Sequence, residues 1–243
     1  MTKTLLGVSL FSFSVLFSAT TFAQTTPDYA KLIEQAHQKY KSNNDGKVAD
    51  YIPALATYSP NNFAITIATV DGKIYQVGDV NKPFPMESLS KVFTMALAME
   101  QHGPQVVLDK LGANATGMPF NSGLAVELTK GAPENPLVNA GAMSTVSLIE
   151  AKDKTDRWNK ILDNLNVWAD ATLTVNEPVF KSEMETNQHN QALAKLMESY
   201  NSFYGNTDEA VEIYTRQCSV DITVEQLAKM GAVLANKGKS PFN

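Results

Sequence analysis

Residues 83–94, with the sequence PFPMESLSKVFT, constrain this chain more than any other stretch. Two prolines end an extended segment, and apolar side chains then recur at helical spacing through residues 92–99. This pattern predicts a helix with Ser88 at or just inside its first turn and Lys91 one turn later on the same face. Side chains three positions apart on a helix have Cβ atoms ~5–6 Å from each other, so the hydroxyl and the amine are expected to lie within reach.

A serine followed by a lysine three positions later is the pattern of the S-x-x-K serine hydrolases. The hydroxyl becomes a good nucleophile only when an adjacent base takes its proton. A lysine can do this only when neutral, so its pKa must fall from ~10.4 by burial or by a nearby cation. The apolar side chains expected around the amine are those of Leu89, Val92, Phe93 and Met95.

The spacing alone also has a simpler interpretation. Ser88 is the one serine of the sequence with lysine three positions on, and chance alone predicts about one such pair in a chain of this composition. Ser88 could cap a helix while Lys91 reaches water. A capping box, however, would place Glu or Gln at position 91, which slightly disfavours this alternative.

The first 23 residues have the features of a secretory signal peptide. Lys3 precedes a mostly apolar stretch over residues 5–17, and a small-x-small cleavage site ends at Ala23, before Gln24. The apolar stretch is shorter than the ~20 residues that span a bilayer, so no membrane anchor is expected. The mature protein is therefore expected to be periplasmic or secreted.

Composition excludes several classes of protein. The formal net charge is −5 and there is no basic stripe, which argues against nucleic acid as a partner. Cys218 is the single cysteine, so no intramolecular disulfide can form. The three histidines show no metal-ligand spacing. The 44% hydrophobic content is enough for a buried core, and one mixed domain is expected over residues 24–243.

The elements expected along the chain place strands before helices, which indicates an α+β fold. Residues 63–70 and 73–77 are predicted to form an antiparallel hairpin that turns at Asp71-Gly72. Residues 118–134 are predicted to be mostly loop, and Asn139 is expected to open the helix that follows. Helices are predicted at residues 28–40, 105–111, 140–151, 156–169, 182–200, 207–218 and 223–236.

Two strands are fewer than the three or more that an independently stable sheet needs. We therefore expect the sequence to be the front part of a larger domain, so that residues 24–243 form an incomplete one.

Four sequence motifs occur in a fixed order over nearly the whole mature chain: GKVADYIP at residues 46–53, ESLSK at 87–91, NPLVNAGA at 135–142 and QCS at 217–219. Together they resemble the serine-dependent glutaminases, which have the β-lactamase/transpeptidase-like fold. The resemblance implies hydrolysis of L-glutamine to L-glutamate and ammonia through a γ-glutamyl-serine intermediate, without metal or cofactor. It also implies a homotetramer.

The resemblance further assigns roles to seven residues, several of which have an alternative. Asn139 could be a helix N-cap, Glu183 and Asn190 could lie on a solvated helix face, and Tyr214 could belong to the core. Glu183, Asn187 and Asn190 are expected on one face of one helix. The implied roles are nucleophile for Ser88, base for Lys91, proton transfer for Tyr214, and substrate binding for Tyr51, Asn139, Glu183 and Asn190.

The chain departs from the family pattern at its C-terminal side, where a pocket tyrosine and a glycine-rich strand of the oxyanion hole are not found. The fragment itself is therefore expected to have little activity. Two other functions stay open. A β-lactamase or penicillin-binding enzyme would share the S-x-x-K helix, but no Ser-Asp-Asn or Lys-Thr-Gly motif is present. A non-catalytic member could act as a binding module.

Overall fold

The computed structural model describes residues 27–242. The signal peptide expected over residues 1–23 lies outside the described residues. Within residues 27–242, no helix combines the length and the apolar character that a membrane crossing requires.

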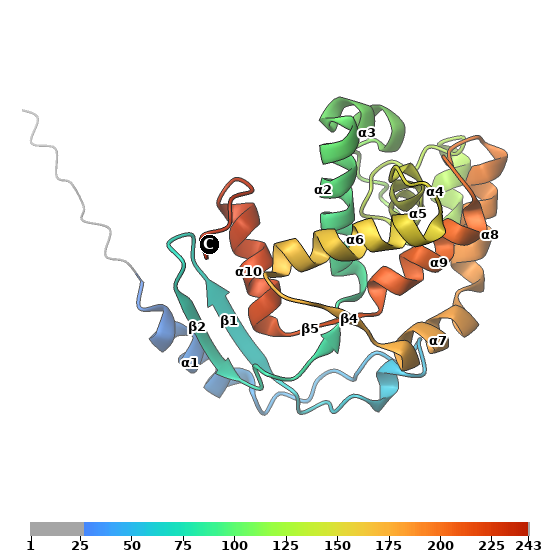
Figure 1. Ribbon diagram of the computed structural model, residues 1–243. Helices are drawn as coiled ribbons and strands as arrows, with labels where there is room; N and C mark the ends of the chain where they lie inside the picture. The colour runs from blue at the N-terminus through green and yellow to red at the C-terminus, as the bar shows by residue number, and fades with distance from the viewer. Residues whose placement is uncertain (1–26, 243) are drawn as a thin grey trace, which may run out of the picture.

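The N-terminal part is a helix packed on a β-hairpin, as the sequence predicts (Figure 1). Strands β1 (Ala64–Ala68) and β2 (Ile74–Gly78) pair antiparallel, and Gly72 takes a φ of 81° in the turn between them. Helix α1 (Tyr29–Tyr40) contacts both strands, while α10 (Val224–Ala235) packs against β1. Strand β1 is shorter than the stretch expected at residues 63–70, while β2 has the expected length and is shifted by one residue.

A second, small sheet was not predicted from the sequence. Its order is β3 (Phe84–Pro85), β5 (Val220–Ile222), β4 (Thr174–Val175), and both pairings are antiparallel. Strands of two or three residues are too short to show alternating polarity, which explains why the pattern gives no signal. The sheet fixes the segment before Ser88 to the end of a helix more than a hundred residues away, since Met86 N–H donates to Val220 O.

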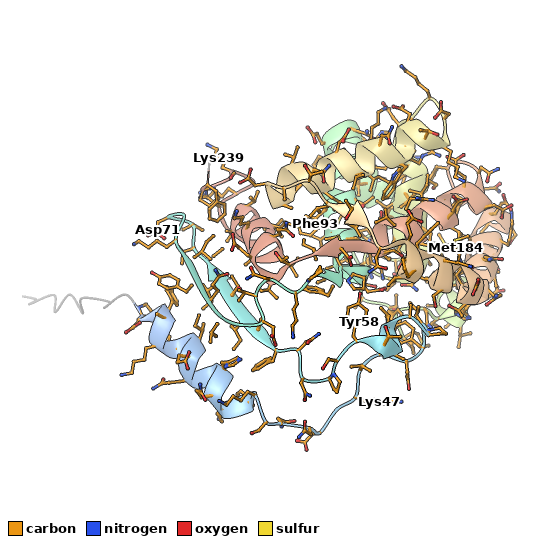
Figure 2. The ribbon with its side chains drawn as sticks, turned by 60° about the horizontal axis from the view of Figure 1, so that its bottom comes forward. Lys47, Tyr58, Asp71, Phe93, Met184 and Lys239 are labelled. Carbon is orange, nitrogen blue, oxygen red and sulfur yellow. The ribbon has the colours of Figure 1, made fainter. Side chains whose placement is uncertain are left out.

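The rest of the chain is a helical subdomain built around a buried helix. All ten residues of α5 (Asn139–Leu148) are buried, and the helix contacts α2, α8 and α9. Figure 2 shows Phe93 inside this part, where its ring lies 5.2 Å from that of Trp168. The other helices are α2 (Ser90–His102), α3 (Pro104–Leu111), α4 (Gly123–Leu128), α6 (Lys154–Ala169), α7 (Glu177–Thr186), α8 (Gln188–Ser199) and α9 (Thr207–Cys218), with 3₁₀ turns η1 (Leu55–Thr57) and η2 (Glu87–Leu89).

The first turn of α5 lies unusually close to the preceding loop. A Cβ atom at Gly141 would lie 1.9 Å from the carbonyl oxygen of Asn135, so only glycine fits there. This close approach holds the segment before α5 against the helix and fixes where Asn139 points.

The helices differ from the expectations in two places, while Asn139 opens α5 as expected. The 118–134 stretch contains α4, capped by the Ser122 side chain. Residues 182–200 form two helices, α7 and α8, which are separated at Asn187. The amphipathic pattern of the sequence continues through this break. Asn187 lies between the two helices, and its Nδ2 donates to Thr215 Oγ1 on α9 at 3.3 Å. Asn139 is the first residue of α5 and does not cap it.

Candidate active site

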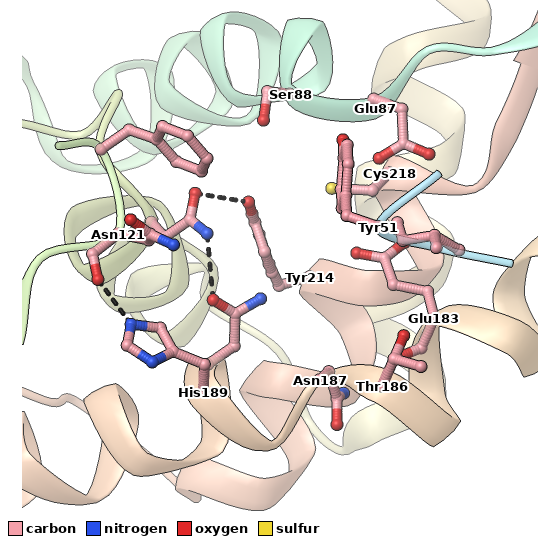
Figure 3. Close-up of a pocket in the computed structure, with 14 residues that line it drawn as sticks. Tyr51, Glu87, Ser88, Asn121, Glu183, Thr186, Asn187, His189, Tyr214 and Cys218 are labelled. Carbon is pink, nitrogen blue, oxygen red and sulfur yellow. Dashed lines mark hydrogen bonds between the residues drawn. The ribbon is translucent and has the colours of Figure 1, made fainter. Parts of the chain in front are cut away.

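A pocket opens where the start of α2, the start of α5, the α7–α8 break and the end of α9 meet (Figure 3). Six of the seven residues expected at the site line it, and Lys91 lies buried behind it. The full lining is Tyr51, Ile52, Glu87, Ser88, Phe120, Asn121, Asn139, Glu183, Thr186, Asn187, His189, Asn190, Tyr214 and Cys218.

Ser88 lies in the 3₁₀ turn η2, immediately before α2, and is exposed to the pocket. The preceding residue, Glu87, has a φ of 49°, which is uncommon for a residue other than glycine. Such strained backbone persists only where the surroundings hold it, and it is concentrated at functional sites. The strained turn presents Ser88 at the N-terminal end of a helix.

Buried polar side chains hold this turn in place. Ser90 Oγ donates to Glu87 O at 2.7 Å and accepts from Gln217 Nε2 at 3.2 Å. Thr94 Oγ1 in turn donates to Gln217 Oε1 at 2.9 Å. The QCS motif therefore braces the turn that carries Ser88, although it lies about 130 positions further along the sequence.

The amine of Lys91 is 4% exposed and binds two neutral oxygens. Its Nζ donates to Asn139 Oδ1 at 2.7 Å and to Leu137 O at 3.1 Å. Burial lowers the pKa of Lys91, while the neighbouring Cys218 acts in the opposite direction. In the described part of the chain, the hydrogen bonds of Lys91 thus go to the start of α5 rather than to Ser88.

Asn139 connects the other polar groups of the site. Its Oδ1 accepts from Lys91 and, at 3.2 Å, from Tyr214 Oη, while its Nδ2 donates to Asn190 Oδ1 at 3.0 Å. Tyr214 is 2% exposed, and burial, followed by the charge of Cys218, raises its pKa well above the usual value. A hydrogen bond with Ser88 acts in the opposite direction. Tyr214 therefore stays protonated next to Ser88.

Two carboxyl groups lie on the opposite side of the pocket. Glu183 on α7 is 7% exposed, and burial followed by the charge of Glu87 raises its pKa to about 8. Burial raises the pKa of Glu87 to about 7. Ser219 Oγ donates to Glu183 Oε2 at 3.5 Å. Tyr51, whose side chain is largely exposed, also lines the pocket. Partial burial, followed by the charges of Glu87 and Glu183, raises its pKa.

Glu87, Glu183 and Cys218 are the one group of possible metal ligands found in the described residues, with ligand atoms within 4.8 Å of one another. Metal binding requires the deprotonated forms of such ligands. Burial instead favours the neutral forms of all three, because it raises each pKa.

The structure corrects the expected placement of the substrate-binding residues and adds others. Glu183 lies on α7 and Asn190 on α8, so they share a pocket and not a helix. Glu87 received no role from the sequence, although its position next to Ser88 was a usable signal. The sequence also assigned no role to Phe120 and Asn121, which lie in the stretch expected to be mostly loop, or to His189 on α8. His189 Nε2 lies 2.6 Å from Asn121 O.

Comparison with known proteins shows the family to which the chain is similar. The family model described as Glutaminase matches residues 46–243. The glutaminase of Colwellia psychrerythraea is 49% identical over 216 residues, which cover 89% of this chain and 70% of that protein. The solved structure of the probable glutaminase ybaS has a TM-score of 0.86 at 45% identity and covers 88% of this chain and 69% of its own.

A further solved structure, Mglu in its glutamate form, has a TM-score of 0.81 at 31% identity. The match covers 88% of this chain and 49% of that one. These structural matches confirm the α+β, β-lactamase-like fold expected from the sequence. On the family model and on the identity to its relatives, the chain belongs to the glutaminase family.

Proposed function

We propose that this chain hydrolyses L-glutamine to L-glutamate and ammonia, with Ser88 as the nucleophile of a γ-glutamyl-serine intermediate. One observation carries the proposal: Ser88 faces a pocket beside a buried Lys91 and a buried Tyr214, and both of these bind the same Asn139 oxygen. Membership of the glutaminase family supports the choice of substrate.

In the acylation step, Ser88 Oγ attacks the side-chain amide carbon of glutamine, a C–O bond forms and the C–N bond breaks. The proton of Ser88 ends on the departing ammonia. Water then hydrolyses the ester, which releases glutamate and restores the hydroxyl. No metal or cofactor takes part in this scheme.

We assign the first proton transfer to Lys91. A neutral amine has two hydrogens, and these suffice for its two partners, Leu137 O and Asn139 Oδ1. The remaining lone pair is then free to accept the serine proton. The lowered pKa of Lys91 increases the fraction of this neutral form. Tyr214, kept protonated by burial, is suited to pass a proton to the leaving nitrogen.

The polar end of the substrate is assigned to the groups across the pocket. A carboxylate at Glu183 attracts the α-ammonium, and the amides of Asn139 and Asn190 are placed to bind the α-carboxylate. Tyr51 covers this end of the pocket from the loop at residues 46–53.

The class of reaction is tested by comparing two assays on the same preparation, ammonia release from L-glutamine and hydrolysis of the β-lactam nitrocefin. We expect ammonia release at a low rate, in line with the little activity expected from the sequence, lost in Ser88→Ala, and no nitrocefin hydrolysis above the buffer rate. Nitrocefin hydrolysis without ammonia release would instead favour the β-lactamase alternative. Absence of both, with glutamine still bound, would favour a binding module.

We also propose a periplasmic or secreted location and a homotetramer. The location is supported by the charge and apolar pattern of residues 1–23. N-terminal sequencing of the protein from a bacterial host should read from Gln24, and an intact Met1 would contradict it. Light scattering should give four times the mass of the mature chain, and a monomer at micromolar concentration would contradict the tetramer.

A further inference from the structure

Glu87 and Glu183 face each other across one end of the pocket, with Cys218 between them (Figure 3). The carboxylate oxygens and the Cys218 sulfur lie within 4.8 Å of one another. Glu87 Oε1 is buried and has no hydrogen-bond partner. A buried carboxylate oxygen without a partner is costly, which points to a group that is bound there during function.

The groups around the pair do not neutralise it. Tyr51 and Tyr58 face Glu87 from the N-terminal loop, and Tyr214 and Cys218 face Glu183 from α9. None of the ion pairs found within residues 27–242 includes either carboxyl group.

The basic side chain near these groups, Lys91, is coupled to Cys218, and its Nζ donates to Leu137 O and Asn139 Oδ1 rather than to either carboxyl group. It is therefore already engaged on the other side of the site.

We propose that Glu87 and Glu183 form one proton-sharing pair that receives the α-ammonium group of the substrate. The empty pair holds a proton, and it releases this proton to solvent when the cation enters. This inference rests on the proposed function, because it specifies how the same pocket recognises the amino end of glutamine.

The physical reasons are the burial of both carboxyl groups and, for Glu183, the added cost of a second negative charge nearby. Two carboxylates that share a buried site do not both ionise readily, so the pair keeps a proton. The raised pKa values of Glu87, to about 7, and of Glu183, to about 8, agree with a proton held at neutral pH. An ammonium between them stabilises the doubly ionised form, so binding lowers both pKa values and expels the proton.

The carboxyl pair then favours substrates that carry a positively charged amino group. L-Glutamine binds more tightly as the pH rises through neutrality, by up to about tenfold per pH unit for one proton released. 4-Carbamoylbutanoate, which is glutamine without its amino group, should not release a proton and should bind more weakly as the pair ionises.

Calorimetry of the Ser88→Ala chain with L-glutamine, in two buffers of different ionisation enthalpy at pH 7, counts the released protons. We expect close to one proton per glutamine bound and none for 4-carbamoylbutanoate. Glu87→Gln should reduce the release at pH 7, because the charge of Glu87 then no longer raises the pKa of Glu183. The matched control is Asp221→Asn, which removes another partly buried carboxyl group that does not line the pocket, and it should leave the release unchanged.

Glutamine binding without proton release, or a release that is unchanged in Glu87→Gln, would overturn the pair while leaving the proposed function intact. Failure of glutamine to bind, together with no ammonia release from the unmodified chain, would overturn both. Circular dichroism checks that each variant is folded, and a KM of the unmodified enzyme that falls between pH 6 and 8 is a second readout.

Discussion

Substitution of Lys91 tests the proposed role of a single residue, because arginine keeps the positive charge but not the basic amine. Lys91→Arg keeps a cation but cannot supply a neutral base near pH 7, so kcat should fall nearly as far as in Lys91→Ala. Lys195→Arg, at an exposed lysine, is the matched control and should retain full activity. Steady-state kinetics checks this, and substantial turnover in Lys91→Arg would exclude the base role.

Glu183 is predicted to act through the charge of the substrate. One carboxylate about 4 Å from an ammonium is worth up to ~4 kcal/mol at an effective dielectric near 20. Glu183→Gln should therefore raise KM for L-glutamine strongly, while at pH 4.5, where the folded protein keeps this carboxyl protonated, it leaves the melting temperature nearly unchanged. The prediction is checked by comparing L-glutamine with 4-carbamoylbutanoate. If the wild-type protein uses both compounds equally well, the assigned role is wrong.

Among the elements, α5 is the one whose position the site depends on. Gly141→Ala forces a Cβ against Asn135 O, so the free energy of unfolding should drop by about 1–3 kcal/mol and Asn139 should shift. Gly231→Ala is the matched control, because nothing lies within 4 Å of its Cβ position in α10. It should be stabilising by about 0.5–1 kcal/mol. Thermal unfolding of both variants measures the contrast; equal effects would contradict the close approach.

Sequence patterns predicted those elements whose own residues determine them. The hairpin follows from β-branched strands around Asp71-Gly72, and α9 was predicted with its observed bounds, Thr207–Cys218. The break between α7 and α8 depends on Thr215, which is distant in sequence, so the local pattern could not show it. The sheet β3-β5-β4 likewise depends on pairings between distant segments.

The candidate site likewise combines features that the sequence predicted with features that only the folded chain shows. The spacing of Ser88 and Lys91 predicted that they lie on adjacent turns, but the partner of Lys91 is Asn139, which only the folded chain brings close. Asn139 alone reads as a helix cap, and its role as a shared acceptor depends on α5 being buried. The sequence assigned no role to Glu87, because its positive φ angle and its unpartnered carboxylate oxygen are seen only in the structure.

For the whole molecule, the two buried carboxyl groups predict how stability changes with pH. Burial raises the pKa of Glu87 from 4.5 to about 7, so the folded state holds a proton that the unfolded state has released between these values. The stability contributed by the protonated group is full below pH 4.5 and is lost as the pH rises through about 7. Glu183 extends the same loss to about pH 8.

Replacing Glu87 by glutamine removes this titration. Glu87→Gln should raise the melting temperature relative to wild type at pH 8, by the equivalent of up to roughly 3 kcal/mol, and change it little at pH 4.5. Thermal unfolding across this range measures the difference. A wild-type protein that becomes more stable between pH 5 and 8 through these groups would contradict the assigned pKa directions.

The central claim is that Ser88 carries the γ-glutamyl group, and trapping that ester tests it most directly. The protein is mixed with ¹³C-labelled L-glutamine, quenched in acid within milliseconds, digested and analysed by mass spectrometry. Trapping needs only the first half of the reaction. We predict a labelled glutamyl adduct on the peptide that contains Ser88, assigned by fragmentation to that residue and absent in Ser88→Ala. A labelled adduct on Ser90 or Cys218, or one that persists in Ser88→Ala, would contradict the account.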